Sequence, residues 1–355
     1  MAVVDEGTLY AKAVLAEWSK KVFMRVGVGE TDAVVLVDSL IEANLRGVDT
    51  HGVTRMLPIY IQRIRAGGLN PETKLEIVRE RPGTALIDCH NGIGQVGADF
   101  AMNMAIAKAE EVGVAFVAVA HSNHYGTSAY WAMKALDHGM IGFSCVNAPA
   151  AAAPTGGREP MFGTNPFAVA VPVGKELPFV LDLATTVATR GRIDLCRRQN
   201  KALEPGWAFD AMGRPTTDPV EAMKGLLAPI AGYKGYGIAF AIDILSGVLT
   251  ASNYGKHFPG MLTENPEKPT DVGGVFAAIR IDSFMDLQEF NDRMEKACRE
   301  VRACDKAEGV DRIYIPGEME HNVKAERLVK GIPLPDALRA DFERLGAELD
   351  LPFPK

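Results

Sequence analysis

The 355-residue sequence has few cysteines and no long uninterrupted apolar run. Its five cysteines are scattered and form no CxxC pair, so neither a zinc site nor a disulfide framework is indicated. No apolar run reaches about 18 residues, which argues against a membrane-spanning helix. The first stretch, MAVVDEGTLYAKAVLAEW, lacks the apolar core of a secretory signal. These absences predict a cytoplasmic protein in a reducing compartment.

An excess of positive charge is also missing. The formal net charge is −7, which gives no electrostatic reason to expect nucleic acid or an anionic membrane as a partner. Hydrophobic residues make up 47% of the chain and charged residues 23%, as in an ordinary globular protein. The length suits one large domain or two.

The pattern of apolar residues changes near residue 75, from helix-like segments to short apolar runs that alternate with helices. Strands are expected at 84–88, 114–120, 141–146, 167–172, 179–183 and 275–281. Helices are expected at 98–111, 128–138, 188–198, 236–249 and 285–303. Such alternation favours an α/β fold with a substantially parallel sheet.

A GxGxxG pattern, GIGQVG at residues 92–97, lies between a predicted strand and a predicted helix. A Rossmann dinucleotide-binding turn also requires an acid at the end of the second strand. Here that strand, 114–120, ends in Ala120-His121-Ser122, and Glu110 and Glu111 lie at the end of the preceding helix. We interpret the glycines as residues that allow a tight turn and close helix packing.

A short polar turn between two helix-like segments, Asp49-Thr50-His51-Gly52, holds the first candidate site. Histidine changes its charge near neutral pH, and the Thr50 hydroxyl could hydrogen-bond the His51 ring. Arg55 can present a bidentate fork to a carboxylate. The turn therefore predicts proton transfer beside a bound acid, although a histidine in a helix-capping turn is a reasonable structural alternative.

Three further features point to ligand binding. His121 and His124, in HSNHYG, follow an apolar strand, and ligands bind at strand ends in α/β sheets; this HxxH lacks a third ligand, so no metal is predicted. Asp182 could contact ribose hydroxyls or cap the next helix. Lys234, between two glycines at a helix start, would suit a pyrophosphate or be a solvated loop lysine.

Seven blocks of the sequence, in order from about residue 40 to residue 320, resemble the type 2 malate/L-lactate dehydrogenase family. The blocks are NLRGVDTHGVTRM, HSNHYGTSAYWAMKALDHGMIGF, GREPMFGTNPFAVAVP, DLATTVATRGRI, GRPTTDP, GYKGYGIAFAIDIL and RIYIPGEME. The resemblance implies an α/β fold with a three-layer mixed sheet and a non-Rossmann NAD(P)-binding domain at residues 76–284. It also implies a helical N-terminal segment, 1–75, against which a C-terminal segment, 285–355, packs.

The same resemblance implies the chemistry. The cofactor would be NAD or NADP, the substrate a small 2-hydroxy or 2-oxo acid, and the assembly a homodimer. His51 would exchange the proton at the C2 oxygen, Thr50 would orient it, and Arg55 would hold the carboxylate. Some members give the proton-transfer role to the histidine that matches His124, and Thr164 matches a threonine that contacts substrate or nicotinamide. Cofactor-binding positions match His121, Ser122, Asn123, His124, Tyr125, Asp182, Leu183, Ala184, Lys234, Gly235, Gly317 and Glu318.

One block separates branches of the family. Cyclic-imine reductases resemble His-Gly-Asp where this chain has Arg190-Gly191-Arg192. The malate/lactate-like branch tends to carry a cation at the position of Arg192, so Arg190 and Arg192 join the predicted substrate-binding residues and favour an acidic substrate. Reduction of a cyclic imino acid and non-catalytic NAD(P) binding remain the alternatives. The sequence does not distinguish NAD from NADP as the cofactor. It also does not show whether His51 or His124 is the principal proton-transfer residue.

Overall fold

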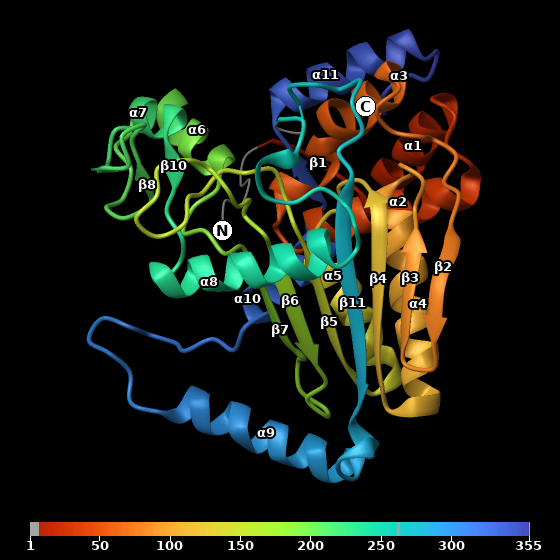
Figure 1. The fold of residues 1–355 in the computed structure, drawn as a ribbon, viewed down its shortest axis with the longest axis vertical. Coiled ribbons are helices and arrows are strands. Elements are labelled where there is room, and N and C mark those ends of the chain that lie inside the picture. The colour runs from red at the N-terminus through yellow and green to blue at the C-terminus, as the bar shows by residue number, and fades with distance from the viewer. Residues whose placement is uncertain (1–6, 261–262, 355) are drawn as a thin grey trace.

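The computed structural model describes residues 7–260 and 263–354, so the first six residues of the predicted N-terminal segment lie outside the described residues. A seven-stranded sheet forms the centre (Figure 1), with the order β2-β3-β4-β11-β5-β6-β7. Its strands are β2 (Glu76–Arg81), β3 (Thr84–Asp88), β4 (Val114–Ser122), β5 (Met140–Val146), β6 (Phe167–Val171), β7 (Phe179–Leu183) and β11 (Val272–Arg280).

The expectation of a substantially parallel sheet is wrong. Among the described strands of this sheet, only β3 and β4 pair in parallel, through the crossover helix α4 (Gly94–Val112). β11 arrives from far along the chain and pairs antiparallel with β4 and β5, and β5, β6 and β7 pair antiparallel in sequence. The mixed sheet implied by the family resemblance is confirmed.

Helices cover both faces of the sheet. On one face, α4 and α5 (Ser128–Met133) pack over β4, β11, β5 and β6. On the other lies α8 (Tyr233–Asp243), whose Ile242 joins a buried cluster with Val275. Successive side chains of β11 point to opposite faces of the sheet, because Val275 packs on the α8 side and Phe276 packs on the α4 side.

The N-terminal helices share one core with the end of the chain. This part contains β1 (Thr8–Tyr10), α1 (Lys12–Arg25), α2 (Glu30–Leu45), α3 (Gln62–Ala66), α10 (Glu318–Lys330), β12 (Ile332–Leu334) and α11 (Asp336–Glu348). β1 pairs antiparallel with β12, and the ring of Trp18 lies 5.1 Å from that of Phe342 and 4.7 Å from that of Phe353. The helix α9 (Leu287–Ala303) instead packs beside β7, where Cys298 of the helix and Phe179 of the strand belong to one apolar cluster. The division of the chain at residues 75 and 284 stays a prediction.

A small lobe, of which the sequence predicted only the helix at 188–198, stands beside the sheet (Figure 1). It contains α6 (Arg190–Arg198), α7 (Pro219–Lys224) and the three short strands β8 (Ala208–Phe209), β9 (Pro215–Thr216) and β10 (Leu226–Leu227). Ile193, Ala208 and Leu227 belong to a separate buried cluster. No helix in the described part of the chain is long and apolar enough to cross a membrane.

The GxGxxG turn is filled by protein. A Cβ on Gly94 would lie 2.2 Å from the carbonyl oxygen of Asn123 and 2.5 Å from that of His124. The cavity beside this turn is only about 10 Å³, far too small for a pyrophosphate. The packing interpretation is therefore confirmed, and Gly94 supports the loop that carries His124.

We expect Gly94→Ala to destabilise the protein by roughly 1–3 kcal/mol, because backbone must move to admit the methyl group. Cofactor affinity of the folded fraction should change little. Gly29→Ala is the matched control, because a Cβ at Gly29 meets nothing within 4 Å. Thermal melting and a cofactor titration check this. An unchanged melting temperature combined with a large rise in the cofactor Kd would contradict it.

Candidate active site

The turn that carries His51 is clamped between α2 and α10. The turn consists of η1 (Asp49–His51) and η2 (Val53–Arg55). The buried Asp49 carboxylate accepts hydrogen bonds from Asn44 at 2.7 Å and from Arg327 at 2.7 and 3.0 Å. The other side of the Asn44 amide accepts the Val53 N–H at 2.9 Å. Buried, hydrogen-bonded charges of this kind hold a backbone in one geometry.

His51 and His124 meet face to face. Their rings are stacked with centroids 5.6 Å apart and an angle of 21° between the planes. His51 Nδ1 lies 3.0 Å from the Thr50 hydroxyl, which confirms the contact expected from the sequence. Burial, and then the cation of Arg55, lowers the pKa of His51 to about 3. Burial also lowers the pKa of His124 well below its usual value, so both rings are neutral at physiological pH.

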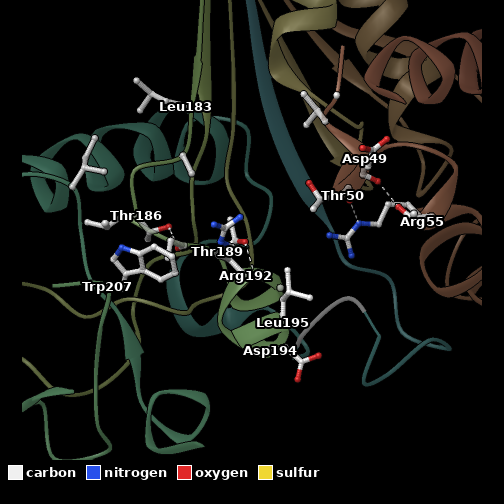
Figure 2. A pocket seen from close by; sticks show the side chains of 18 of the residues that line it. Asp49, Thr50, Arg55, Leu183, Thr186, Thr189, Arg192, Asp194, Leu195 and Trp207 are labelled. Carbon is white, nitrogen blue, oxygen red and sulfur yellow. Dashed lines mark hydrogen bonds between the residues drawn. The ribbon is translucent and has the colours of Figure 1, made fainter. Parts of the chain in front are cut away.

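Arg55 supplies positive charge next to this pair. Its Nε donates to the carbonyl oxygen of Thr50. Among the described residues, no further hydrogen bond or ion pair is found for its terminal nitrogens. Figure 2 shows the guanidinium directed toward the space between the turn and the small lobe. A cation in this position is available to a carboxylate.

A cavity of about 1,020 Å³ lies between the His51 turn, the end of β7 and the small lobe. Thr50 and Arg55 line one wall, and Arg192 and Trp207 line the opposite wall (Figure 2). Leu183 and Ala184, at the end of β7, and residues 186–189 line the space between them. The volume is at the upper end of the range for small-molecule sites, roughly 300–1,000 Å³.

The two arginines of TRGRI have different surroundings. Arg190 donates to the carbonyl oxygens of Met223 and Gly225, both at 2.9 Å, which ties α6 to α7. Arg192 lies in the cavity wall with its guanidinium carbon 5.7 Å from the centroid of the Trp207 ring. Asp194, the nearest carboxylate in sequence, pairs instead with Arg197 and Arg198. Arg192 is thus the stronger candidate for a ligand contact.

The predicted cofactor loop 121–125 is held largely by protein contacts. His121 pairs with Asp271 at 2.8 Å, and the Asn123 amide bonds Asn91, Gly92 and Thr270. Tyr125 lies 2.8 Å from Ser128 in the buried core, and Ser122 is buried as well. His124 contacts His51, and direct cofactor contacts of the other four residues stay predictions.

The remaining predicted cofactor-binding positions differ in whether they line the cavity. Leu183 and Ala184 line the cavity. Asp182 accepts the Ala129 N–H at 3.1 Å; desolvation by neighbouring protein raises its pKa to about 6, although part of the side chain remains accessible to solvent. Lys234 is exposed in the first turn of α8.

Other parts of the same chain contact the last four predicted positions, which are Gly235, Gly317, Glu318 and Thr164. A Cβ on Gly235 would lie 2.1 Å from the Ile230 carbonyl oxygen, and one on Gly317 would lie 2.9 Å from the Val180 Cβ. Glu318 is buried and accepts from Arg302 at 2.8 Å. The Thr164 carbonyl oxygen accepts from Thr185 at 2.8 and 2.9 Å, while its side chain is half-buried. Direct ligand contacts at these positions stay predictions.

Sequence reasoning missed several residues that build the site. Asp49 and Arg327 look like surface charges in the sequence, yet each is less than a tenth exposed. Trp207 lies between α6 and β8, in a segment for which no site residue was predicted. Tyr60 contacts His124, and Gln95 contacts Tyr60. In the sequence these two residues carried no signal beyond an apolar run and the glycine turn.

The comparisons with known proteins identify the family. A model of the malate/L-lactate dehydrogenase family matches residues 11–343, so the chain belongs to that family and is an oxidoreductase acting on a CH–OH group. The malate dehydrogenase of Pyrococcus abyssi (strain GE5 / Orsay) is 40% identical over 340 residues, which cover 93% of this chain and 92% of the relative.

Two further proteins show the range of the family. The ureidoglycolate dehydrogenase (NAD(+)) of Escherichia coli O157:H7 is 33% identical over 312 residues, covering 88% of both chains. Among solved structures, the sulfolactate dehydrogenase from Methanocaldococcus jannaschii superimposes with a TM-score of 0.92 at 36% identity, covering 98% of both chains. The fold is therefore that of these dehydrogenases.

Proposed function

We propose that this enzyme transfers a hydride between the nicotinamide of NAD or NADP and C2 of a 2-hydroxy or 2-oxo acid that carries a second anionic group. The observation that carries the proposal is the pair of cations, Arg55 and Arg192, on opposite walls of one cavity. Arg55 adjoins the histidine pair, so it suits the C1 carboxylate. Arg192 suits the distal anion.

In this proposal the chain orients the acid and moves one proton, while the cofactor supplies the hydride chemistry. Arg55 fixes the carboxylate, which places C2 before reaction. His51 accepts the hydroxyl proton during oxidation and returns it during reduction. A substrate carboxylate bound at Arg55 would offset the positive charge that helps to lower the pKa of His51, and so would make the ring a better base. Thr50 orients the His51 ring through the 3.0 Å contact.

The cavity is compatible with a nicotinamide cofactor beside a small acid. Its volume of about 1,020 Å³ exceeds the needs of the acid alone. The backbone from Leu183 to Thr189 is rich in small residues, which allows close approach, and Arg198 adds a cation to the lining. We propose that Leu183 and Ala184 contact the cofactor. Asp182, Lys234, Gly235, Gly317 and Glu318 remain predicted contacts.

The proposal is tested with the purified enzyme, NADH or NADPH, and a panel of oxaloacetate, sulfopyruvate, pyruvate and a cyclic imine. Loss of absorbance at the reduced-nicotinamide band reports turnover and identifies the preferred cofactor. We expect the oxo acids with a second anion to react fastest. Turnover of the imine alone would favour a cyclic-imino-acid reductase, and binding of NAD(P) without turnover would favour a non-catalytic protein.

Arg192→Met tests the second cation. Losing a charge-assisted hydrogen bond costs roughly 1.5–3 kcal/mol, so kcat/KM for oxaloacetate should fall about ten- to a hundredfold. Pyruvate, which has no second anion, should be affected little. Arg197→Met is the control, because Arg197 pairs with Asp194 on the same helix and is not among the cavity-lining residues. A small, equal loss for both substrates would contradict the role of Arg192.

We also propose that the enzyme is a cytoplasmic homodimer. All five cysteines are free, which suits a reducing compartment. A row of apolar side chains is exposed along α8 and the π-type turn Ile244–Val248 that follows it. These side chains are Tyr233, Phe240, Ile244, Val248 and Leu249. An apolar surface of this kind favours burial against a second copy of the chain.

Sedimentation of Val248→Asp checks the dimer. Val248 is 52% exposed, so the substitution should leave the fold intact and shift the enzyme toward a monomer. Val329→Asp, on α10, is the control, because its side chain is 87% exposed and lies outside the apolar row. A wild-type enzyme that sediments as a fully active monomer at assay concentration would refute the proposal.

A further inference from the structure

A chain of buried hydrogen bonds ends on the ring of His124. The Tyr60 hydroxyl lies 2.7 Å from His124 Nδ1, and the Gln95 amide nitrogen donates to the Tyr60 oxygen at 2.5 Å. The Gly126 N–H donates to the same Nδ1 at 3.4 Å. Tyr60 is 1% exposed and Gln95 is fully buried.

These contacts fix the position of the proton on the ring. A backbone N–H can only donate, so the contact from Gly126 requires a lone pair on Nδ1 of His124. The Tyr60 oxygen accepts from Gln95, which leaves its own hydrogen for Nδ1. Reversing the Gln95 amide would make His124 Nδ1 the donor to Tyr60, and would set this N–H against that of Gly126. The arrangement consistent with these hydrogen bonds has Nδ1 of His124 unprotonated and the proton on Nε2.

The contrast with His51 assigns separate roles to the two rings. His51 Nδ1 contacts the Thr50 hydroxyl, and a hydroxyl can rotate to donate or accept. His51 can therefore change its protonation state without losing that bond. His124 cannot accept a proton at Nε2, which already carries one, and releasing that proton would leave a strongly basic imidazolate.

We propose that Tyr60 and Gln95 are positioning residues that hold His124 in the neutral Nε2–H form, so that His124 donates a hydrogen bond to the C2 oxygen of the substrate while His51 exchanges the proton. The assignment to the C2 oxygen rests on the proposed function; the ring form rests on the hydrogen bonds alone. A donor fixed before the reaction stabilises the negative charge that develops on that oxygen.

The experiment is ¹⁵N NMR of the histidine rings in the full-length enzyme, with the His124 signals identified by their loss in His124→Asn. We expect Nδ1 in the unprotonated range and Nε2 in the protonated range, unchanged between about pH 5 and 8. Tyr60→Phe should give a mixture of ring forms. Its kcat should fall roughly ten- to a hundredfold with little change in KM, as when a partner that orients a functional histidine is lost.

Tyr130→Phe is the control, because Tyr130 donates to Asp38 away from the site and should leave kcat unchanged. Should Tyr60→Phe fold poorly, Gln95→Met breaks the same chain from its other end and should change the ring form likewise. A wild-type His124 protonated at Nδ1, or an unchanged ring form and kcat in Tyr60→Phe, would overturn the proposal. A wild-type enzyme with the expected ring form but no turnover of any 2-oxo acid would refute the proposed function and the bond to the C2 oxygen, and leave the ring form confirmed.

Discussion

His51→Gln is expected to lower kcat by about 10²–10⁴-fold, because general acid–base help at the C2 oxygen is worth that much. Glutamine keeps the approximate size and polarity of the ring but cannot carry the proton. The clamp of Asp49, Asn44 and Arg327 lies beneath the turn and does not involve the ring, so the fold should persist. Cofactor Kd should change little.

Two comparisons sharpen the His51 result. His138→Gln replaces an exposed histidine that pairs with Glu110, and should leave kcat unchanged. Thr50→Val removes the hydroxyl that orients His51, and should produce a smaller loss than His51→Gln itself. Near-normal turnover of His51→Gln would transfer the proton-exchange role to His124. It would also contradict the separation of the roles of the two rings.

Arg55→Met is expected to reduce kcat/KM about ten- to a hundredfold for every 2-oxo acid, because all of them share the C1 carboxylate. The variant also removes the bond from Arg55 to the Thr50 carbonyl oxygen, so part of the loss will come from the turn. Arg55→Lys separates the two effects: lysine keeps the charge but not the planar fork, and should recover only part of the activity.

The outcome for Arg55 has a second readout. The Arg55 cation is one of the causes that lower the pKa of His51, so removing it should raise that pKa. A ¹⁵N titration of His51 in Arg55→Met follows this shift. If Arg55→Met impairs oxaloacetate but spares pyruvate, Arg55 holds the distal anion, and the proposed orientation of the acid is reversed.

The positions of most strands could be predicted because their apolar runs are short and bounded by turns, as at β3 and β7. Strand direction could not, because β11 enters the sheet from residue 272, and no local pattern shows where a distant strand inserts. The sheet of the small lobe was missed because β8, β9 and β10 have only two residues each.

The site could be predicted where function is carried by a local turn. Thr50, His51 and Arg55 lie within six residues of one another, so their proximity is already in the sequence. Tyr60 and Gln95 reach His124 only through the fold, since the packing of Gly94 against the His124 loop brings α4 to it. Residues that meet only in the folded chain have no characteristic spacing in the sequence, so contacts of this kind could not be predicted from it.

We propose that this enzyme reduces a 2-oxo acid that carries a second anion. The most direct test is the ratio of kcat/KM for oxaloacetate to that for pyruvate, measured with the preferred reduced cofactor. One additional charge-assisted bond, at Arg192, predicts a ratio of about ten to a hundred in favour of oxaloacetate. A ratio near one, or turnover confined to a cyclic imine, would contradict the account.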